Sequence, residues 1–454
     1  MRRLLAALAV LAALAAAPSA SAAEVGLVPD LTWGITPAEQ DRTAAAIGDL
    51  GARWVRLNVQ WKYWEYRGPS IVVQDSGSRR AADRSVDLAR AAGAKVVLMV
   101  YNAPDWAAAN SSEQGQVPRN PQDYANFLRT LAAHYRGKVD AYEIWNEPDL
   151  NRFWGTGPSA TAYTALLKPA YAAVKQGDPK AKVVFGGLSW DYTREGNFVQ
   201  RAYGYGARGH FDVLAIHPYP EGDLTAWQGW YRKARQTMVA NGDAAKPIWF
   251  TEFGANTSDR AYDPGSGAWQ GGVSEAEQAT LLTQAFTLLE ADPYVQVVCW
   301  YNLRNNYWDE DDPSSVEGSF GLLRTDFSPK PAYAAFKRYA AGLAASPVSG
   351  LPAPVNAAPV VRLTSPAPGS SFSRTLRLAA TATDDVRVTR VVFAVNGRKV
   401  ATDTSAPYET WWGGARKAAA GSHTVTATAY DASGASAVAI AVVVKGAAKS
   451  LRRR

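Results

Sequence analysis

The sequence predicts a (β/α)8 barrel, an α/β fold, followed by a small all-β sandwich. Three observations lead to this fold class. Eight short apolar runs alternate with helical patterns between residues 23 and 344. A Pro- and Ala-rich stretch follows at 345–358, and from 359 onward short segments alternate with period two. A change of period across a linker of this composition indicates two domains.

Each of the eight apolar runs is short and rich in β-branched residues, as is typical of strands in a parallel sheet covered by helices. The runs lie at 31–35, 54–59, 95–100, 140–145, 182–187, 212–217, 247–253 and 295–301. Eight such units are the number that closes a barrel with its active site at the C-terminal strand ends. An open doubly wound sheet is the alternative, but the first stretch, "LTWGITPAEQ", lacks the phosphate-binding glycine loop typical of that fold.

The segments between the runs carry helix-start signals. Residues 36–39 form a capping box with proline at the first helical position, and residues 274–277 repeat the box without it. Between 120 and 137 the apolar residues keep to one helical face until a glycine ends the pattern. Pro169 lies inside the next helical pattern and indicates a kink or a break there.

The two ends of the chain differ from its body. Residues 1–22 are typical of a signal peptide, with two arginines, an apolar stretch and a small-residue cleavage site. The apolar stretch is shorter than the roughly 20 residues of a membrane span, so we expect a secreted protein with no span after cleavage. Residues 447–454 form a basic tail. The basic residues in 1–22 and 445–454 account for the formal net charge of +7, so the neutral body argues against nucleic-acid binding.

Composition argues against a cofactor. The chain has one cysteine, Cys299, inside the apolar run "VQVVCWY", so no internal disulfide can form and we interpret it as an inert core thiol. The four histidines show no metal-ligand spacing. The 16 Trp and 21 Tyr residues instead favour a sugar ligand, because flat aromatic faces pack against pyranose rings.

Two glutamates stand at the ends of the fourth and seventh runs. Glu147 follows "YEIWN", and Glu252 closes "PIWFTE". Strands four and seven face each other across the mouth of a barrel, so the two carboxylates could act on one glycosidic bond. A structural ion pair is the alternative for Glu147. We expect that role for Glu143, one layer deeper in the same strand, with Arg56 as its cation.

The motifs "IWNEP" and "FTEFG" at these two strand ends resemble the signatures of the clan A glycoside hydrolases, which are retaining enzymes built on (β/α)8 barrels. The resemblance covers residues 25 to 344. It implies that Glu147 is the general acid/base and that Glu252 is the nucleophile. The stretch "WNEPDLNRFWG" looks most like glycoside hydrolase family 39, with family 5 second. Family 39 acts on several substrates, so the sugar is not inherited from the resemblance.

The resemblance also implies which side chains bind the sugar. Asn146 would hydrogen-bond the sugar 2-hydroxyl, and Arg56 would steady the nucleophile. His217 and Tyr219 in "AIHPYP" would line the site, and Trp300 in "CWYN" would form the floor of the catalytic subsite.

Further aromatic residues near the expected mouth could line an extended groove, which favours an endo-acting enzyme. The alternative is that several of them pack beneath the loops. They are Tyr101, Trp106 and Trp190, which we include among the substrate-binding candidates, together with Trp61, Trp64, Trp154 and Trp308.

Residues 359–446 resemble bacterial immunoglobulin-like modules. Asn396-Gly397 between two alternating segments predicts a hairpin, and the short strands suit a β-sandwich. The resemblance implies a spacer or a cell-wall attachment unit, and the basic tail is a second candidate for wall contact. Alternation should bury one of Trp411 and Trp412, which favours packing over a sugar platform.

Together the motifs predict a secreted, retaining glycoside hydrolase that cleaves a poly- or oligosaccharide by double displacement and needs no cofactor or metal. The two carboxyl groups should then lie about 5 Å apart. A transglycosylase with the same residues is one alternative. A non-catalytic carbohydrate-binding or cell-wall protein on a barrel scaffold is another.

Overall fold

The structure is a computed structural model of the chain. It describes residues 23–32, 35–66, 68, 77–189, 197–220, 224–258, 272–305, 316–342, 358–383, 388–431 and 436–446. The chain divides into two compact units, Met1–Ser349 and Gly350–Arg454. The predicted signal peptide, nearly all of the predicted linker and the basic tail lie outside the described residues.

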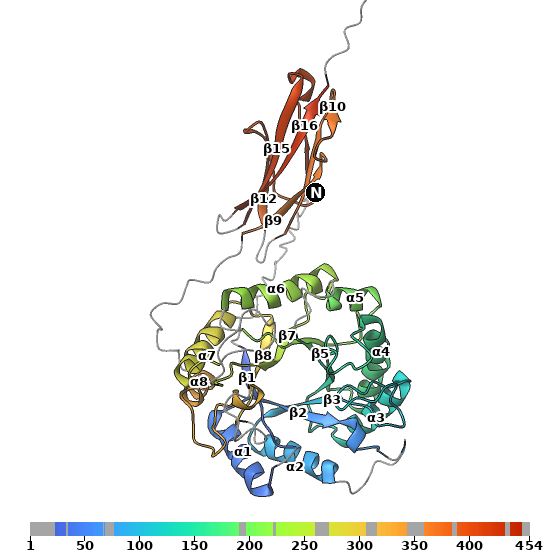
Figure 1. The fold of residues 1–454 in the computed structure, drawn as a ribbon, viewed down its shortest axis with the longest axis vertical. Helices are drawn as coiled ribbons and strands as arrows, with labels where there is room; N and C mark the ends of the chain where they lie inside the picture. Colours follow the sequence, from blue (N-terminus) through green and yellow to red (C-terminus); the bar gives the residue numbers. More distant parts are fainter. Residues whose placement is uncertain are drawn as a thin grey trace, which may run out of the picture. The chain divides into compact units, whose positions relative to one another are not determined.

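The first unit is a closed barrel of eight parallel strands in sequential order, and Figure 1 shows helices forming a ring around it. The predicted barrel is confirmed, and the open sheet is excluded. The strands are β1 (Glu24–Val28), β2 (Trp54–Gln60), β3 (Lys95–Tyr101), β4 (Ala141–Asn146), β5 (Lys182–Leu188), β6 (Val213–Ile216), β7 (Ile248–Phe253) and β8 (Val295–Tyr301). The helices are α1 (Pro37–Leu50), α2 (Gly77–Ala91), α3 (Pro121–His134), α4 (Ala160–Gly177), α5 (Phe198–Gly204), α6 (Leu224–Ala240), α7 (Glu275–Leu289) and α8 (Pro331–Ala340).

The first strand differs from the prediction. β1 is the segment "EVGLV", whereas the predicted strand at 31–35 is not a strand in its described residues. Gly26 explains why this segment closes the barrel. A Cβ atom there would lie 2.8 Å from Cys299 Sγ and 2.8 Å from Trp54 Cβ, so only glycine allows the close approach of β1 to its neighbours. Leu31 is still buried, as part of the core.

The helix-start signals are confirmed. Both capping boxes form, at Thr36 before α1 and at Ser274 before α7, and Asn120 caps α3. Pro169 does not break its helix, because α4 runs from Ala160 to Gly177 through it. Buried residues line α4 on both sides of the proline, so packing holds the helix together despite the missing N–H donor.

The barrel unit has an inner and an outer core. Small side chains and two tryptophans, Trp54 and Trp249, fill the inside, together with the buried Cys299. A larger apolar core packs between the strands and the surrounding helices. Burial raises the pKa of the Cys299 thiol to about 12, which agrees with an inert core residue. Among the described residues, no helix is long and apolar enough to cross a membrane.

The second unit is a β-sandwich of two sheets, ordered β10-β16-β15-β12-β13 and β14-β11-β9. The Asn396-Gly397 turn joins β12 to β13, with both residues at positive φ, as the hairpin prediction requires. Trp412 packs against the sandwich core, whereas Trp411 is exposed. The strands are β9 (Val360–Ser365), β10 (Ser371–Phe372), β11 (Arg377–Thr383), β12 (Val388–Val395), β13 (Arg398–Asp403), β14 (Tyr408–Trp411), β15 (Gly421–Asp431) and β16 (Ser436–Lys445).

Candidate active site

The end of β4 turns two consecutive polar side chains toward the barrel axis. Ile144 and Trp145 both pack in the outer core, and Trp145 has a φ of 77°. This left-handed residue interrupts strand alternation, so Asn146 and Glu147 follow on the inner side. Glu147 itself has a φ of 38°, and its backbone N–H still donates to Gly187 O of β5 at 3.0 Å. Non-glycine residues in this region cost free energy and concentrate at functional sites.

The end of β7 also brings two consecutive polar side chains into the site, here through a register shift. The pairing of β7 with β8 shifts register between Phe250 and Phe253, and both of these phenylalanines belong to the outer core. Between them, Thr251 and Glu252 contact polar side chains inside the barrel. A bulge that re-aims side chains beside an active site is a recurrent device in sheets.

Arg56 of β2 joins the carboxylates at the bottom of the site. It is fully buried and donates from Nε to Glu143 Oε2 at 2.6 Å and from Nη1 to Glu252 Oε1 at 2.5 Å. Its Nη2 donates to Glu143 Oε1 at 3.2 Å and to Asn146 Oδ1 at 2.8 Å. The prediction that Glu143 forms an ion pair inside the barrel is confirmed. Burial opposes the charge of Arg56, but the two carboxylates outweigh it and raise the arginine pKa.

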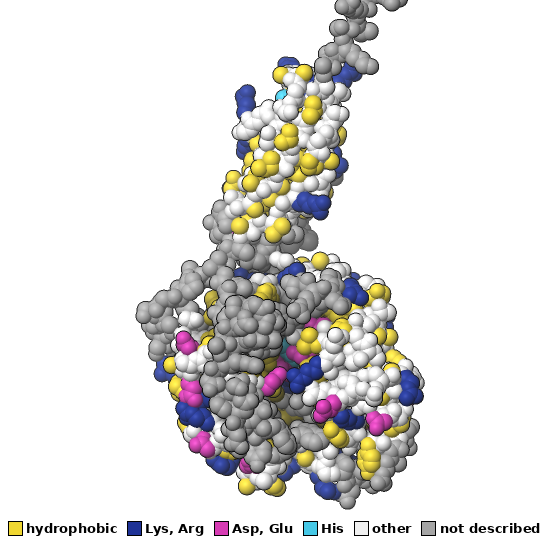
Figure 2. Space-filling view, in the orientation of Figure 1, with side chains coloured by type: hydrophobic (Ala, Val, Ile, Leu, Met, Phe, Trp, Pro, Cys, Tyr) yellow, Lys and Arg dark blue, Asp and Glu magenta, His cyan; other side chains and the backbone are white. Residues whose placement is uncertain are grey.

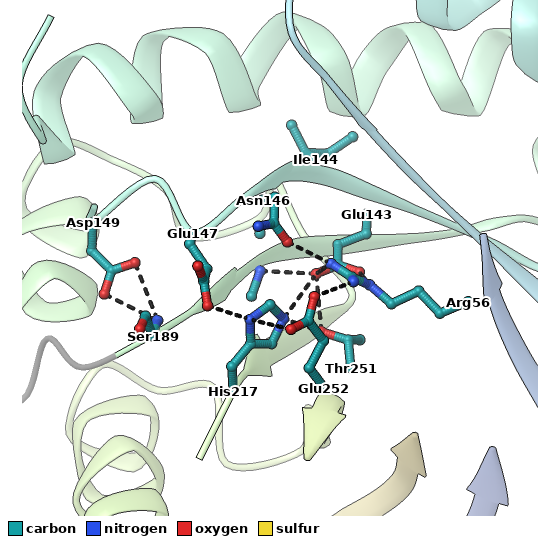
Figure 3. Close-up of polar contacts among 12 residues, drawn as sticks. Arg56, Glu143, Ile144, Asn146, Glu147, Asp149, Ser189, His217, Thr251 and Glu252 are labelled. Atoms are coloured by element: carbon teal, nitrogen blue, oxygen red, sulfur yellow. Dashed lines mark hydrogen bonds and ion pairs between the residues drawn. The ribbon is translucent and has the colours of Figure 1, made fainter. Parts of the chain in front are cut away.

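Glu147 and Glu252 face each other across His217, as Figure 3 shows. His217 follows β6, and its Nδ1 lies 2.8 Å from Glu147 Oε1 and 3.7 Å from Glu252 Oε2. One carboxylate oxygen of each glutamate and one ring nitrogen of His217 all lie within 4.8 Å of one another. On this face of the barrel, acidic and histidine side chains are visible at the centre (Figure 2).

The surroundings separate the pKa values of the two glutamates. Burial raises the pKa of Glu147, and the charge of Glu252 adds to this against the effect of His217. Burial acts on Glu252 too, but the charges of His217 and Arg56 and the hydrogen bonds from Tyr219 and Arg56 lower its pKa. Tyr219 donates to Glu252 Oε2 at 2.7 Å, and burial raises the phenol pKa well above its ordinary value. The site therefore favours a protonated Glu147 beside an ionised Glu252.

The same cluster, Glu147, His217 and Glu252, has the spacing to hold a cation. The hydrogen bonds of Glu252 argue against metal binding by this cluster. Both oxygens of Glu252 already accept hydrogen bonds, from Arg56 and from Tyr219, and the guanidinium lies 2.5 Å from one of them. A bound metal ion would have to displace these donors and sit beside a fixed positive charge.

Some of the predicted substrate-binding residues lie around the two glutamates, and others pack against aromatic side chains. Asn146, Arg56, His217 and Tyr219 meet around the two glutamates, as the contacts above show. Tyr101 ends β3 and packs edge-on against Trp145, with its pKa raised by burial to about 12. Trp106 packs edge-on against Trp61 and donates its Nε1–H to Glu65 O at 2.5 Å, so it belongs to the packing beneath a loop. Trp190 lies outside the described residues.

The prediction that Trp300 forms a floor for the sugar is wrong. Trp300 is fully buried in the outer core, where it contacts Phe253 edge-on and donates to Phe320 O at 3.1 Å. Strand alternation instead turns Val297, Cys299 and Tyr301 of β8 toward the barrel axis. Tyr301 is half-buried and packs against the rings of Tyr219 and Phe320. The sequence signal for Tyr301 is its position two residues after Cys299, because alternate residues of a strand point to the same side.

The aromatic groove expected from the sequence has a different composition. Trp61, Trp64 and Trp154 are buried in the core, and Trp308 lies outside the described residues. The exposed aromatic residues that follow β2 at the same edge of the barrel are Tyr63 and Tyr66. Sequence reasoning missed these two, and it also missed Thr251, whose hydroxyl contacts both Glu143 and His217.

Comparison with known proteins identifies the family of the barrel unit. Residues 19–302 match the family model for cellulase, glycosyl hydrolase family 5. The chain belongs to this family. The sequence motifs resemble family 39 most and family 5 next, and the wider resemblance to clan A is confirmed. In the second unit, residues 359–442 match the model of a bacterial Ig domain.

Several solved structures share the fold of this family 5 chain. A family 39 glycoside hydrolase from the gut symbiont Bacteroides cellulosilyticus WH2 is 19% identical, with a TM-score of 0.55 over 86% of this chain and 79% of that one. A glucosidase from Croceicoccus marinus is 15% identical, with a TM-score of 0.55 over 89% and 75%. A monomeric β-xylosidase from Caulobacter crescentus CB15 is 15% identical, with a TM-score of 0.52 over 90% and 73%. At these identities the likeness shows the fold, and family membership makes the chain a glycosidase.

Proposed function

We propose that the chain is a secreted, retaining glycosidase that cleaves a poly- or oligosaccharide by double displacement. The observation that supports this most is the pair formed by Glu147 and Glu252, with carboxylate oxygens within 4.8 Å of each other and pKa values moved in opposite directions. Retaining glycosidases hold their two carboxyl groups about 5 Å apart, whereas inverting enzymes leave room for a water molecule at roughly 6.5 Å or more.

In the first step the ionised Glu252 attacks the anomeric carbon and forms a glycosyl ester, while the glycosidic C–O bond breaks. Glu147 gives its proton to the departing oxygen. In the second step Glu147, now a carboxylate, takes a proton from water, and the water oxygen replaces Glu252 at the anomeric carbon. The amide nitrogen of Asn146 is placed to donate to a sugar hydroxyl, because Arg56 already holds the amide oxygen.

We also propose cleavage within the sugar chain. Tyr63 and Tyr66 are 36% and 50% exposed where the chain leaves β2, and the half-buried Tyr301 lies beside the nucleophile's partner Tyr219. Aromatic faces at separate points of the rim support binding of several sugar units. The sizes of the products from a labelled polysaccharide distinguish internal cleavage from release of end sugars.

The deciding experiment is replacement of the nucleophile. Glu252→Ala should lower turnover of an activated aryl glycoside on the order of 10⁴-fold, and azide should restore turnover with product of the opposite anomeric configuration. Glu147→Ala should impair substrates with poor leaving groups by about 10²–10⁴-fold and activated ones much less.

Glu24→Ala provides the control, because Glu24 begins β1 at the other end of the barrel and pairs with Lys95. This variant should keep its activity. Normal turnover by Glu252→Ala would refute the mechanism. Transfer of the sugar to an added acceptor in place of hydrolysis would identify a transglycosylase.

A further inference from the structure

We propose that Thr251 is a positioning residue that fixes the tautomer of His217 and so keeps a proton available to Glu147. This inference rests on the proposed function and assigns Thr251 a part in its acid step. The position adjoins the nucleophile, but the Thr251 hydroxyl points to a different partner.

A continuous line of polar contacts crosses the buried part of the site (Figure 3). Thr251 Oγ1 lies 2.9 Å from Glu143 Oε1 and 3.1 Å from His217 Nε2. On the other side of the ring, His217 Nδ1 lies 2.8 Å from Glu147 Oε1. Glu143 and Thr251 are completely buried and His217 is 1% exposed, so protein groups rather than bulk water decide where the protons lie.

The direction of these hydrogen bonds follows from Glu143. Its Oε1 accepts from the Gly187 N–H at 2.9 Å and from Arg56 Nη2 at 3.2 Å, and its Oε2 accepts from Arg56 Nε at 2.6 Å. A carboxylate surrounded by such donors acts as an acceptor for Thr251 as well. A hydroxyl has one proton to donate, so Thr251 Oγ1 must accept from His217 and Nε2 must carry a hydrogen.

The consequence falls on the other ring nitrogen. With a hydrogen fixed on Nε2, Nδ1 and Glu147 Oε1 share the remaining proton of the pair. That proton is the one that Glu147 delivers to the leaving oxygen. If the ring hydrogen sat on Nδ1 instead, His217 would donate to an ionised Glu147 and would hold the acid in its inactive form.

Charged and titratable side chains from several elements surround His217. They are Glu143 and Glu147 from β4 and its end, Glu252 from β7, Arg56 from β2 and Tyr219 from the segment after β6. Burial disfavours charge on the ring, but the carboxylates outweigh burial and raise the pKa of His217. Without the Thr251 hydroxyl, no acceptor stabilises the hydrogen on Nε2, so the neutral ring can carry its hydrogen on Nδ1 instead. The Glu147–His217 pair then loses its shared proton at a lower pH.

The test compares Thr251→Val, which removes the hydroxyl at nearly constant shape, with Thr251→Ser, which keeps it. The basic limb of the kcat/KM profile reports the acid. In Thr251→Val this limb should move to lower pH by about one unit, the size of one lost hydrogen bond. In Thr251→Ser it should stay at the wild-type position. The loss of kcat/KM in Thr251→Val should be larger for phenyl than for dinitrophenyl glycosides, because only the former need the proton.

Two results would overturn the proposal. One is a basic limb that coincides in wild type and Thr251→Val. The other is an equal loss on all leaving groups with an unmoved limb, which would mean that Thr251 acts on the neighbouring Glu252. Thermal melting of each variant shows whether the fold is intact.

A second readout does not depend on activity. Nitrogen-15 NMR of the histidine rings, with His217 assigned by its absence in His217→Asn, should show a hydrogen on Nε2 in the wild type and a shift toward Nδ1 in Thr251→Val. Unchanged ring signals in Thr251→Val would contradict the proposal. Failure of the wild type to cleave any glycoside would instead refute the proposed function, and the ring signals would still decide the tautomer.

Discussion

Glu147 and Glu252 carry the same side chain, and their neighbours give them different roles. Glu252 receives a guanidinium and a phenol, which stabilise its charge. Glu147 is buried, and its carboxylate contacts the imidazole of His217. Since burial acts on both, the hydrogen-bond donors decide which one is ionised. Burial and the charge of Glu252 therefore raise the pKa of Glu147, whereas Arg56, Tyr219 and His217 outweigh burial at Glu252 and lower its pKa.

Gly187 supports the same arrangement from β5. Its N–H donates to Glu143, its carbonyl accepts from Glu147 N, and a Cβ atom at this position would lie 2.1 Å from His217 Nε2. Gly187→Ala should therefore push the imidazole away from Glu147. We expect kcat/KM to fall about 10²-fold, as for misplacements of about 1 Å in active sites. Steady-state kinetics on an aryl glycoside measures this.

Gly229→Ala is the matched control for Gly187→Ala. Gly229 lies within α6, and nothing would contact an added Cβ within 4 Å. This change should leave kinetics alone and raise the free energy of unfolding by up to about 1 kcal/mol, since alanine is the better helix former. Wild-type kcat/KM in Gly187→Ala would show that His217 does not need its observed position.

At the residue scale, the strand ends marked Glu147 and Glu252 as candidates, and the resemblance to clan A motifs supplied their roles and the position of His217. The sequence did not predict the Thr251 contacts, which join positions 34 and 108 residues apart in the chain. The deciding signal is three-dimensional, since threonine inside an apolar strand is compatible with ordinary β propensity.

At the scale of elements, strand ends decide which side chains reach the site. From Val297 onward β8 alternates regularly, which brings Tyr301 inward and sends Trp300 to the outer core. β4 and β7 depart from alternation, through Trp145 at positive φ and through the register shift of β7. A one-residue change of phase moves a side chain to the opposite face. A prediction from sequence assumes that inward and outward side chains alternate without interruption, so it misses the irregular ends of β4 and β7.

Variants of Tyr301 and Trp300 test which of these two side chains faces the site. Tyr301→Ala should lower kcat/KM by about 2- to 12-fold, the range of one lost aromatic contact of about 0.5–1.5 kcal/mol. Tyr301→Phe should keep most of that binding. Trp300→Phe should lower the melting temperature through a cavity in the outer core, with a smaller effect on KM. Larger kinetic losses in Trp300→Phe than in Tyr301→Ala would reverse the assignment.

The misplaced first strand has a related cause. Both "EVGLV" and "LTWGI" contain a glycine, but "EVGLV" begins with a charged residue, which lowers a strand prediction, whereas "LTWGI" has none and includes a tryptophan. Gly26 is required by the close approach to Trp54 and Cys299, which becomes visible only when β1 lies between β2 and β8. Barrel closure therefore selects the strand against local preference.

At the scale of the whole molecule, each unit has a core of its own, and the described site residues all belong to the barrel unit. The sandwich presents a different kind of surface. Alternate residues of β16 that point away from its core are apolar and exposed, and Figure 2 shows hydrophobic side chains gathered on this unit. They are Val438, Ile440, Val442 and Val444. An apolar stripe of this kind is typical of contact surfaces rather than of sugar platforms, which use aromatic rings.

This division of labour predicts how truncation affects the enzyme. Removal of 359–454 should leave kcat/KM on a small aryl glycoside unchanged, because the catalytic contacts lie within the barrel. If the sandwich or the basic tail attaches the enzyme to a cell wall, the same truncation should abolish sedimentation with purified wall fragments. A variant lacking only 447–454 separates the two sources, since a contact made by the tail weakens at high salt and one made by the apolar stripe does not. Loss of activity on the small substrate after truncation would mean instead that the sandwich supports the catalytic fold.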